Sequence, residues 1–96
     1  MEIMTTGLAG TMESSDIMVT VSKATGDGIT IALTSSVSKQ FGKQIRAVIR
    51  ECAQKLGVTA ADITVVDQGA LDCVIKARVK TAIYRACLNT DYKWEV

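Results

Sequence analysis

The segment Ala9–Asp16, with the sequence AGTMESSD, holds the side chains best suited to covalent chemistry. Ser14 and Ser15 place two hydroxyls side by side, and Glu13 and Asp16 flank them with negative charge. An enzyme can modify an exposed hydroxyl on such a segment, and a group attached there can swing between active sites. Serines that precede a strand also form turns and solvated surface, so the pattern by itself leaves a purely structural role open.

The other nucleophiles in the chain form no catalytic arrangement. Cys52, Cys73 and Cys87 lie far apart in apolar periodic stretches, without a CxxC pair, and the chain has no histidine. This composition excludes Ser-His-Asp and Cys-His arrangements, and a zinc site would lack its commonest nitrogen ligand. We therefore expect reduced, buried cysteines, no catalytic residue in the chain itself and no metal site.

Size and charge restrict the function further. With 96 residues and 48% hydrophobic content, the chain can form one core, and we expect a single domain over residues 1–96. Little room remains for a deep substrate pocket, which favours a carrier or a binding module over an enzyme. The net charge of +1 predicts neither nucleic acid nor a membrane as partner. No apolar run can span a bilayer and no signal peptide is recognisable, so we expect a cytoplasmic protein.

Strands are predicted where β-branched and polar residues alternate. Residues 17–22 and 29–34 alternate in this way and are separated by the turn formers KATGDG, which predicts a β-hairpin. The run Asp62–Asp67 predicts a third strand. Residues 1–15 show neither a strand nor a helix period, and we expect an extended, mobile segment there.

Two long helices are predicted from apolar residues spaced by three or four. Ser36 or Ser38 can cap the first helix, and Gly57 can end it. The apolar positions of the first helix are Val37, Phe41, Ile45, Val48, Ile49, Cys52 and Leu56. Those of the second are Leu71, Val74, Ile75, Val79, Ala82, Ile83 and Ala86, with Lys76, Lys80 and Arg85 largely outside the buried stripe.

The predicted order is β-β-α-β-α, an α+β fold in which two helices cover one face of a small sheet. Lys43, Arg46 and Arg50 make one face of the first helix basic, which is either solvated surface or a contact for partner subunits or phosphates. In the polar tail 89–96, Tyr92 and Trp94 either pack on the domain or anchor another subunit.

Three blocks of the sequence, in this order, resemble the citrate lyase acyl carrier protein, the gamma subunit of that enzyme. They are AGTMESSDIMVTV, SSVSKQFGKQIR and DQGALDCVIKARVKTAIYRA, and the resemblance covers nearly the whole chain. It implies that Ser14 bears a phosphoribosyl-dephospho-CoA arm, covalently attached through a phosphodiester and derived from 2'-(5''-triphosphoribosyl)-3'-dephospho-CoA. Members of this family commonly have glycine at the next position, where this chain has Ser15, which is the second choice for the modified residue.

The resemblance also implies how the work is divided in the complex. The thiol of the arm carries acetyl and citryl thioesters during cleavage of citrate to acetate and oxaloacetate. An alpha subunit is the acyl transferase, a beta subunit is the citryl lyase, and a separate transferase attaches the prosthetic group. The carrier supplies effective concentration and performs no catalysis of its own.

Two rival functions remain open. The acyl carrier subunit of malonate decarboxylase resembles this family and uses the same type of prosthetic group. A small RNA-binding or regulatory module would also fit the order of sheet and helices and the basic helix faces. Against the RNA-binding alternative, the few aromatic residues lie outside the predicted strands, so they form no RNP-like stacking platform.

Overall fold

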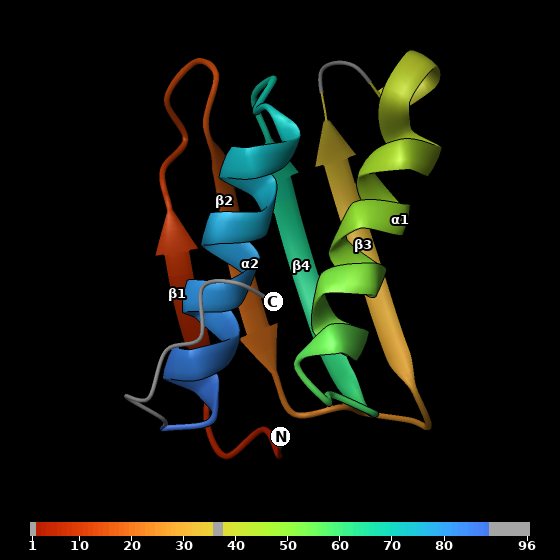
Figure 1. The fold of residues 1–96 in the computed structure, drawn as a ribbon, viewed down its shortest axis with the longest axis vertical. Helices are drawn as coiled ribbons and strands as arrows, with labels where there is room; N and C mark the ends of the chain where they lie inside the picture. The colour runs from red at the N-terminus through yellow and green to blue at the C-terminus, as the bar shows by residue number, and fades with distance from the viewer. Residues whose placement is uncertain (1, 36–37, 89–96) are drawn as a thin grey trace.

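The computed structural model describes residues 2–35 and 38–88, with Ser38 and Lys39 described by their backbone alone. The elements are β1 (Gly7–Gly10), β2 (Ile17–Ser22), β3 (Ile29–Ser35), α1 (Ser38–Lys55), β4 (Ala61–Asp67) and α2 (Asp72–Ala86). Both helices cover the same face of a four-stranded sheet (Figure 1). The α+β class is confirmed, although the order is β-β-β-α-β-α. The proposed caps, Val37 and the tail with Tyr92 and Trp94 lie outside the residues whose side chains are described.

The strand β1 corrects the prediction of an extended segment over residues 1–15. It pairs antiparallel with β2, from Gly7 opposite Val21 to Gly10 opposite Met18. Its four residues, GLAG, include two glycines, which have low β-propensity, so the sequence pattern did not reveal it. The glycines are required by close packing: a Cβ on Gly7 would overlap backbone atoms of α2.

The predicted hairpin between residues 17–22 and 29–34 is wrong, because β4 lies between these two strands in the order β1-β2-β4-β3. β4 pairs antiparallel with β2 and parallel with β3. A parallel pair needs a crossover connection, and α1 supplies it between β3 and β4. The alternating pattern identifies the buried face of a strand but not its neighbours, so it could not show the insertion.

Most predicted core positions are buried between the sheet and the helices. The corrections concern three side chains at helix positions. Phe41 is 48% exposed and Leu71 is 71% exposed, since Leu71 precedes the first turn of α2. Lys80 is only 6% exposed, although we expected it outside the buried stripe; its four-carbon stem lets a lysine lie against apolar surface. No helix in the part of the chain that is described is long and apolar enough to cross a membrane.

Candidate modification site

Ser14 lies in the connection between β1 and β2, residues 11–16, at one end of the sheet (Figure 1). The side chains of Ser14 and Ser15 are both exposed. None of the hydrogen bonds among the described residues involves the Ser14 hydroxyl. A modifying enzyme can therefore approach this oxygen from solvent.

The side chain of Asp16 links the β1–β2 connection to the helix α2. Its carboxylate accepts hydrogen bonds from Thr11 Oγ1 at 2.6 Å and from the Ile17 N–H at 2.7 Å. Arg78 on α2 forms two further bonds with the same carboxylate, through Nε and Nη2, each at 3.1 Å. A bidentate arginine–carboxylate pair is directional as well as electrostatic. Asp16 thus holds the loop in place, so its negative charge is engaged within the fold.

Backbone hydrogen bonds hold the same connection against the end of β4. The Ser15 N–H donates to the Gln68 carbonyl at 2.7 Å, and the Gln68 N–H donates to the Asp16 carbonyl at 2.9 Å. Ser15 has a φ of 65°, a left-handed conformation that favours glycine. The structure therefore gives a physical reason why glycine suits this position, and it presents Ser14 on a hydrogen-bonded turn.

Asp16 is expected to titrate well below its usual range. The hydrogen bond from Thr11, then that from the Ile17 N–H, then those from Arg78 lower its pKa from 3.8 to about 2. Because the pKa is lowered in the folded state, the carboxylate contacts stabilise the fold above about pH 4, and this contribution is lost as the pH falls through 2. An NMR titration of the Asp16 carboxyl carbon should give this low midpoint, and Asp16→Asn should weaken the acid dependence of stability. A midpoint near 3.8 would contradict the contacts described for this loop.

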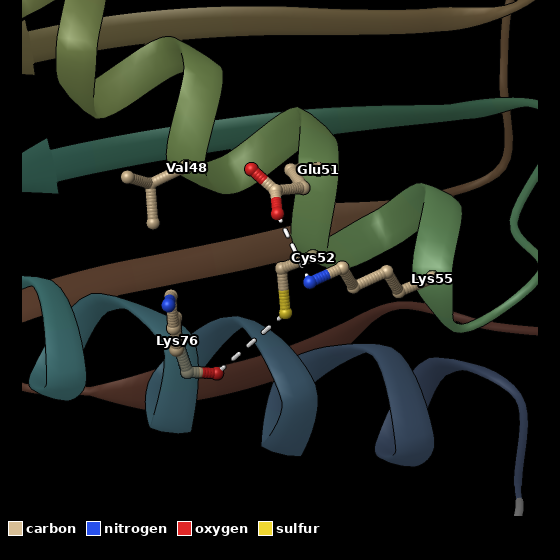
Figure 2. A pocket seen from close by; sticks show the side chains of 5 residues that line it. All are labelled: Val48, Glu51, Cys52, Lys55 and Lys76. Carbon is tan, nitrogen blue, oxygen red and sulfur yellow. Dashed lines mark hydrogen bonds and ion pairs between the residues drawn. The ribbon is translucent and has the colours of Figure 1, made fainter. Parts of the chain in front are cut away.

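The three cysteines differ in how far the fold buries them. All three are free, and Cys52 is buried as expected, whereas Cys87 is only half-buried and Cys73 is exposed. A small cavity of about 30 Å³ is lined by Val48, Glu51, Cys52, Lys55 and Lys76. Figure 2 shows these residues where α1 and α2 face each other. The Cys52 thiol lies 3.8 Å from the Lys76 carbonyl oxygen, and burial raises the pKa of the thiol. The cavity is too small for a substrate, and the described residues contain no cluster that could hold a metal ion.

The basic face of α1 has a structural role at the edge of the sheet. Arg46 Nη1 donates to the Ile31 carbonyl at 2.7 Å, and Arg50 Nη1 lies 3.3 Å from the Ile29 carbonyl. At the opposite edge, Arg85 Nη1 donates to the Leu8 carbonyl at 2.6 Å. Covered edge carbonyls disfavour pairing with another strand. These two cations of α1 are therefore engaged within the fold.

An accessible serine on a turn that Asp16 and Arg78 hold in place suits a carrier protein, and the comparisons with known proteins show that class. The family model ACP, described as malonate decarboxylase delta subunit (MdcD), matches residues 4–86. The citrate lyase acyl carrier protein of Streptococcus mutans is 56% identical over 95 residues, which cover 99% of this chain and 93% of that protein. The one from Oenococcus oeni is 56% identical over 97 residues, covering 100% and 99%.

The chain belongs to the citrate lyase acyl carrier protein family. Its function is that of an acyl carrier with a covalently attached prosthetic group, serving a multi-subunit enzyme without catalysing a reaction alone. A chain in the crystal structure of a Pseudomonas malonate decarboxylase hetero-tetramer in complex with malonate shares the fold, with a TM-score of 0.68. The match covers 90% of this chain and 92% of that one, and at 19% identity it shows the fold alone.

Proposed function

We propose that this chain, as one carrier domain over residues 1–96, is the acyl carrier subunit of citrate lyase and that Ser14 bears its prosthetic group. The observation that carries the proposal is the exposed Ser14 hydroxyl on the turn that Asp16 and Arg78 fasten. The attached group is the dephospho-CoA derivative that the resemblance implies. Ser15 remains the second choice, because its side chain is exposed as well.

The residues around Ser14 fit such a group. The connection 11–16 projects beyond the end of the sheet, so that a long substituent on Ser14 can extend into solvent (Figure 1). During attachment Ser14 Oγ bonds to the phosphorus next to the ribose of the triphosphate donor, pyrophosphate leaves, and the hydroxyl proton passes to the transferase. Once bound, the group supplies a thiol for thioester formation. Thr11, Asp16 and Arg78 hold the attachment point, and no cysteine of the chain is needed.

The partners that we propose are an alpha subunit that transfers the acyl group, releasing acetate, and a beta subunit that forms oxaloacetate. The prosthetic-group transferase is a third, transient partner. We propose that the protein is located in the cytoplasm. The three free cysteines agree with this location, since thiols stay reduced in that compartment. An RNA-binding role has little support, because the described aromatic residues, Phe41 and Tyr84, lie on helices and Tyr84 is buried.

Malonate decarboxylase is the second candidate for the enzyme that this carrier serves. The description of the matching family model and the shared fold favour it. Reconstitution separates the two. We expect the loaded chain to restore citrate cleavage to citrate lyase alpha and beta subunits at least about tenfold more efficiently than it restores malonate decarboxylation to the other complex. This ratio corresponds to about 1.4 kcal/mol of discrimination between the two sets of partners. The unloaded chain is the control and should restore neither activity. Restoration of malonate decarboxylation alone would reverse the assignment.

A further inference from the structure

A groove opens between the start of α1 and the connection from β4 to α2. Its volume is about 370 Å³, within the range of ligand-binding pockets. Two large apolar side chains, Phe41 and Leu71, remain 48% and 71% exposed there. The lining residues are Phe41, Gln44, Ile45, Asp67, Gly69, Ala70, Leu71 and Asp72.

The groove lies next to the residue that binds the Ser14 turn. Gln68, which exchanges backbone hydrogen bonds with Ser15 and Asp16, directly precedes the lining residue Gly69. Figure 1 shows the β1–β2 connection, the β4–α2 connection and the first turns of both helices at the same end of the sheet. A protein that covers Ser14 from this end therefore meets the groove as well.

Both walls of the groove are held in place. The buried Asp67 carboxylate accepts hydrogen bonds from Ser35 Oγ at 2.9 Å and from the Ala70 N–H at 3.0 Å. Across the groove, Gln44 Nε2 lies 3.4 Å from Asp72 Oδ2. A preformed apolar surface loses little conformational freedom when a partner binds to it. Exposed Leu71 is thus available as an anchor.

We propose that this groove is the docking site of the transferase that attaches the prosthetic group to Ser14, an inference that rests on the proposed function. The transferase must bring its donor to within bonding distance of Ser14 Oγ, so its surface lies over the neighbouring residues. The groove lining includes two carboxylates, Asp67 and Asp72, and no cation, although the exposed Lys43 directly precedes the lining residue Gln44 on α1. These carboxylates match a partner that presents an apolar side chain next to a basic group. They disfavour the phosphates of the arm itself as the occupant, since like charges repel.

Leu71→Ser and Phe41→Ser test this docking site, with Leu88→Ser as the matched control. Leu88 is also 71% exposed but follows α2 at its opposite end. The unloaded full-length variants are incubated with purified transferase and 2'-(5''-triphosphoribosyl)-3'-dephospho-CoA, and modification is followed by intact mass. We expect KM for the carrier to rise about tenfold for Leu71→Ser, as when one apolar anchor is lost, with kcat unchanged. Leu88→Ser should match the wild type.

Several outcomes would overturn the docking site. The docking site would be refuted if Leu71→Ser and Phe41→Ser had the same KM for the carrier as the control Leu88→Ser. It would also be refuted if these variants were modified normally and showed a defect only in citrate cleavage. Binding of the arm in the groove, seen as chemical-shift changes at Phe41 and Leu71 when wild-type protein is loaded, would assign the groove to the arm. Failure of the wild type to be modified at all would instead refute the proposed function. Thermal unfolding of each variant verifies that the fold is retained.

Discussion

Ser14→Ala is expected to reduce citrate cleavage by the reconstituted complex to the background of a mixture without carrier. The substitution removes the only oxygen of residue 14 to which the arm can be joined, and the enzyme then has no tethered thiol on which to hold the acyl group. Because Ser14 is exposed and its hydroxyl makes no hydrogen bond among the described residues, the fold should be unaffected. Turnover after loading, with thermal unfolding measured in parallel, shows whether activity is lost without loss of structure.

Ser15→Gly is the matched control for the loss of a hydroxyl. Glycine accepts the φ of 65° at this position without strain, so the turn should persist while the second hydroxyl disappears. We expect this variant to be loaded and active like the wild type. If Ser15→Gly is inactive and Ser14→Ala active, the arm belongs on Ser15.

Gly7→Ala is expected to lower the free energy of unfolding by about 3 kcal/mol, at the upper end of the usual cost of overpacking. A Cβ at this position would overlap the Ala82 carbonyl oxygen and come close to the Ala86 backbone nitrogen and Cβ. β1 would have to move away from α2, and the pairing of β1 with β2 would weaken with it. Urea unfolding monitored by circular dichroism measures the loss.

Gly26→Ala is the control for the added methyl group. A Cβ on Gly26, in the connection between β2 and β3, meets no atom within 4 Å. Its stability should stay within about 0.5 kcal/mol of the wild type, as is usual for surface substitutions. Equal stability of Gly7→Ala and Gly26→Ala would show that β1 does not pack against α2 as described.

Hydrophobic periodicity predicted both helices and three of the four strands, because each of these elements buries one face. Residues 17–22 form β2, and the helix beginning near Ser38 ends at Lys55, shortly before Gly57. The position of β4 could not be predicted in this way, because strand neighbours depend on the α1 crossover. Phe41 and Leu71 fit an apolar stripe by spacing, but both lie where the helices begin, and no other element of the described residues buries them.

The segment AGTMESSD and its resemblance to a family predicted the candidate serine, Ser14. They did not predict the contacts and backbone conformation of the loop that carries it. The Asp16–Arg78 pair joins residues 62 positions apart, and no local pattern encodes such a contact. The left-handed conformation of Ser15 was likewise hidden, since serine is found in many kinds of turn. The contacts of Asp16 with Arg78 and of Ser15 with Gln68 explain how this loop can hold Ser14 in one orientation.

Intact mass followed by peptide mapping, on protein coexpressed with the modifying transferase, tests the central claim most directly. The first lysine is Lys23 and no arginine precedes it, so trypsin releases residues 1–23 as one peptide that contains Ser14 and Ser15 together with Ser22. We predict a single mass increase equal to the phosphoribosyl-dephospho-CoA group, confined to this peptide and located by fragmentation at Ser14. A chain that remains unmodified while the transferase is active, or that carries the group outside this peptide, would contradict the assignment of Ser14 as the attachment site.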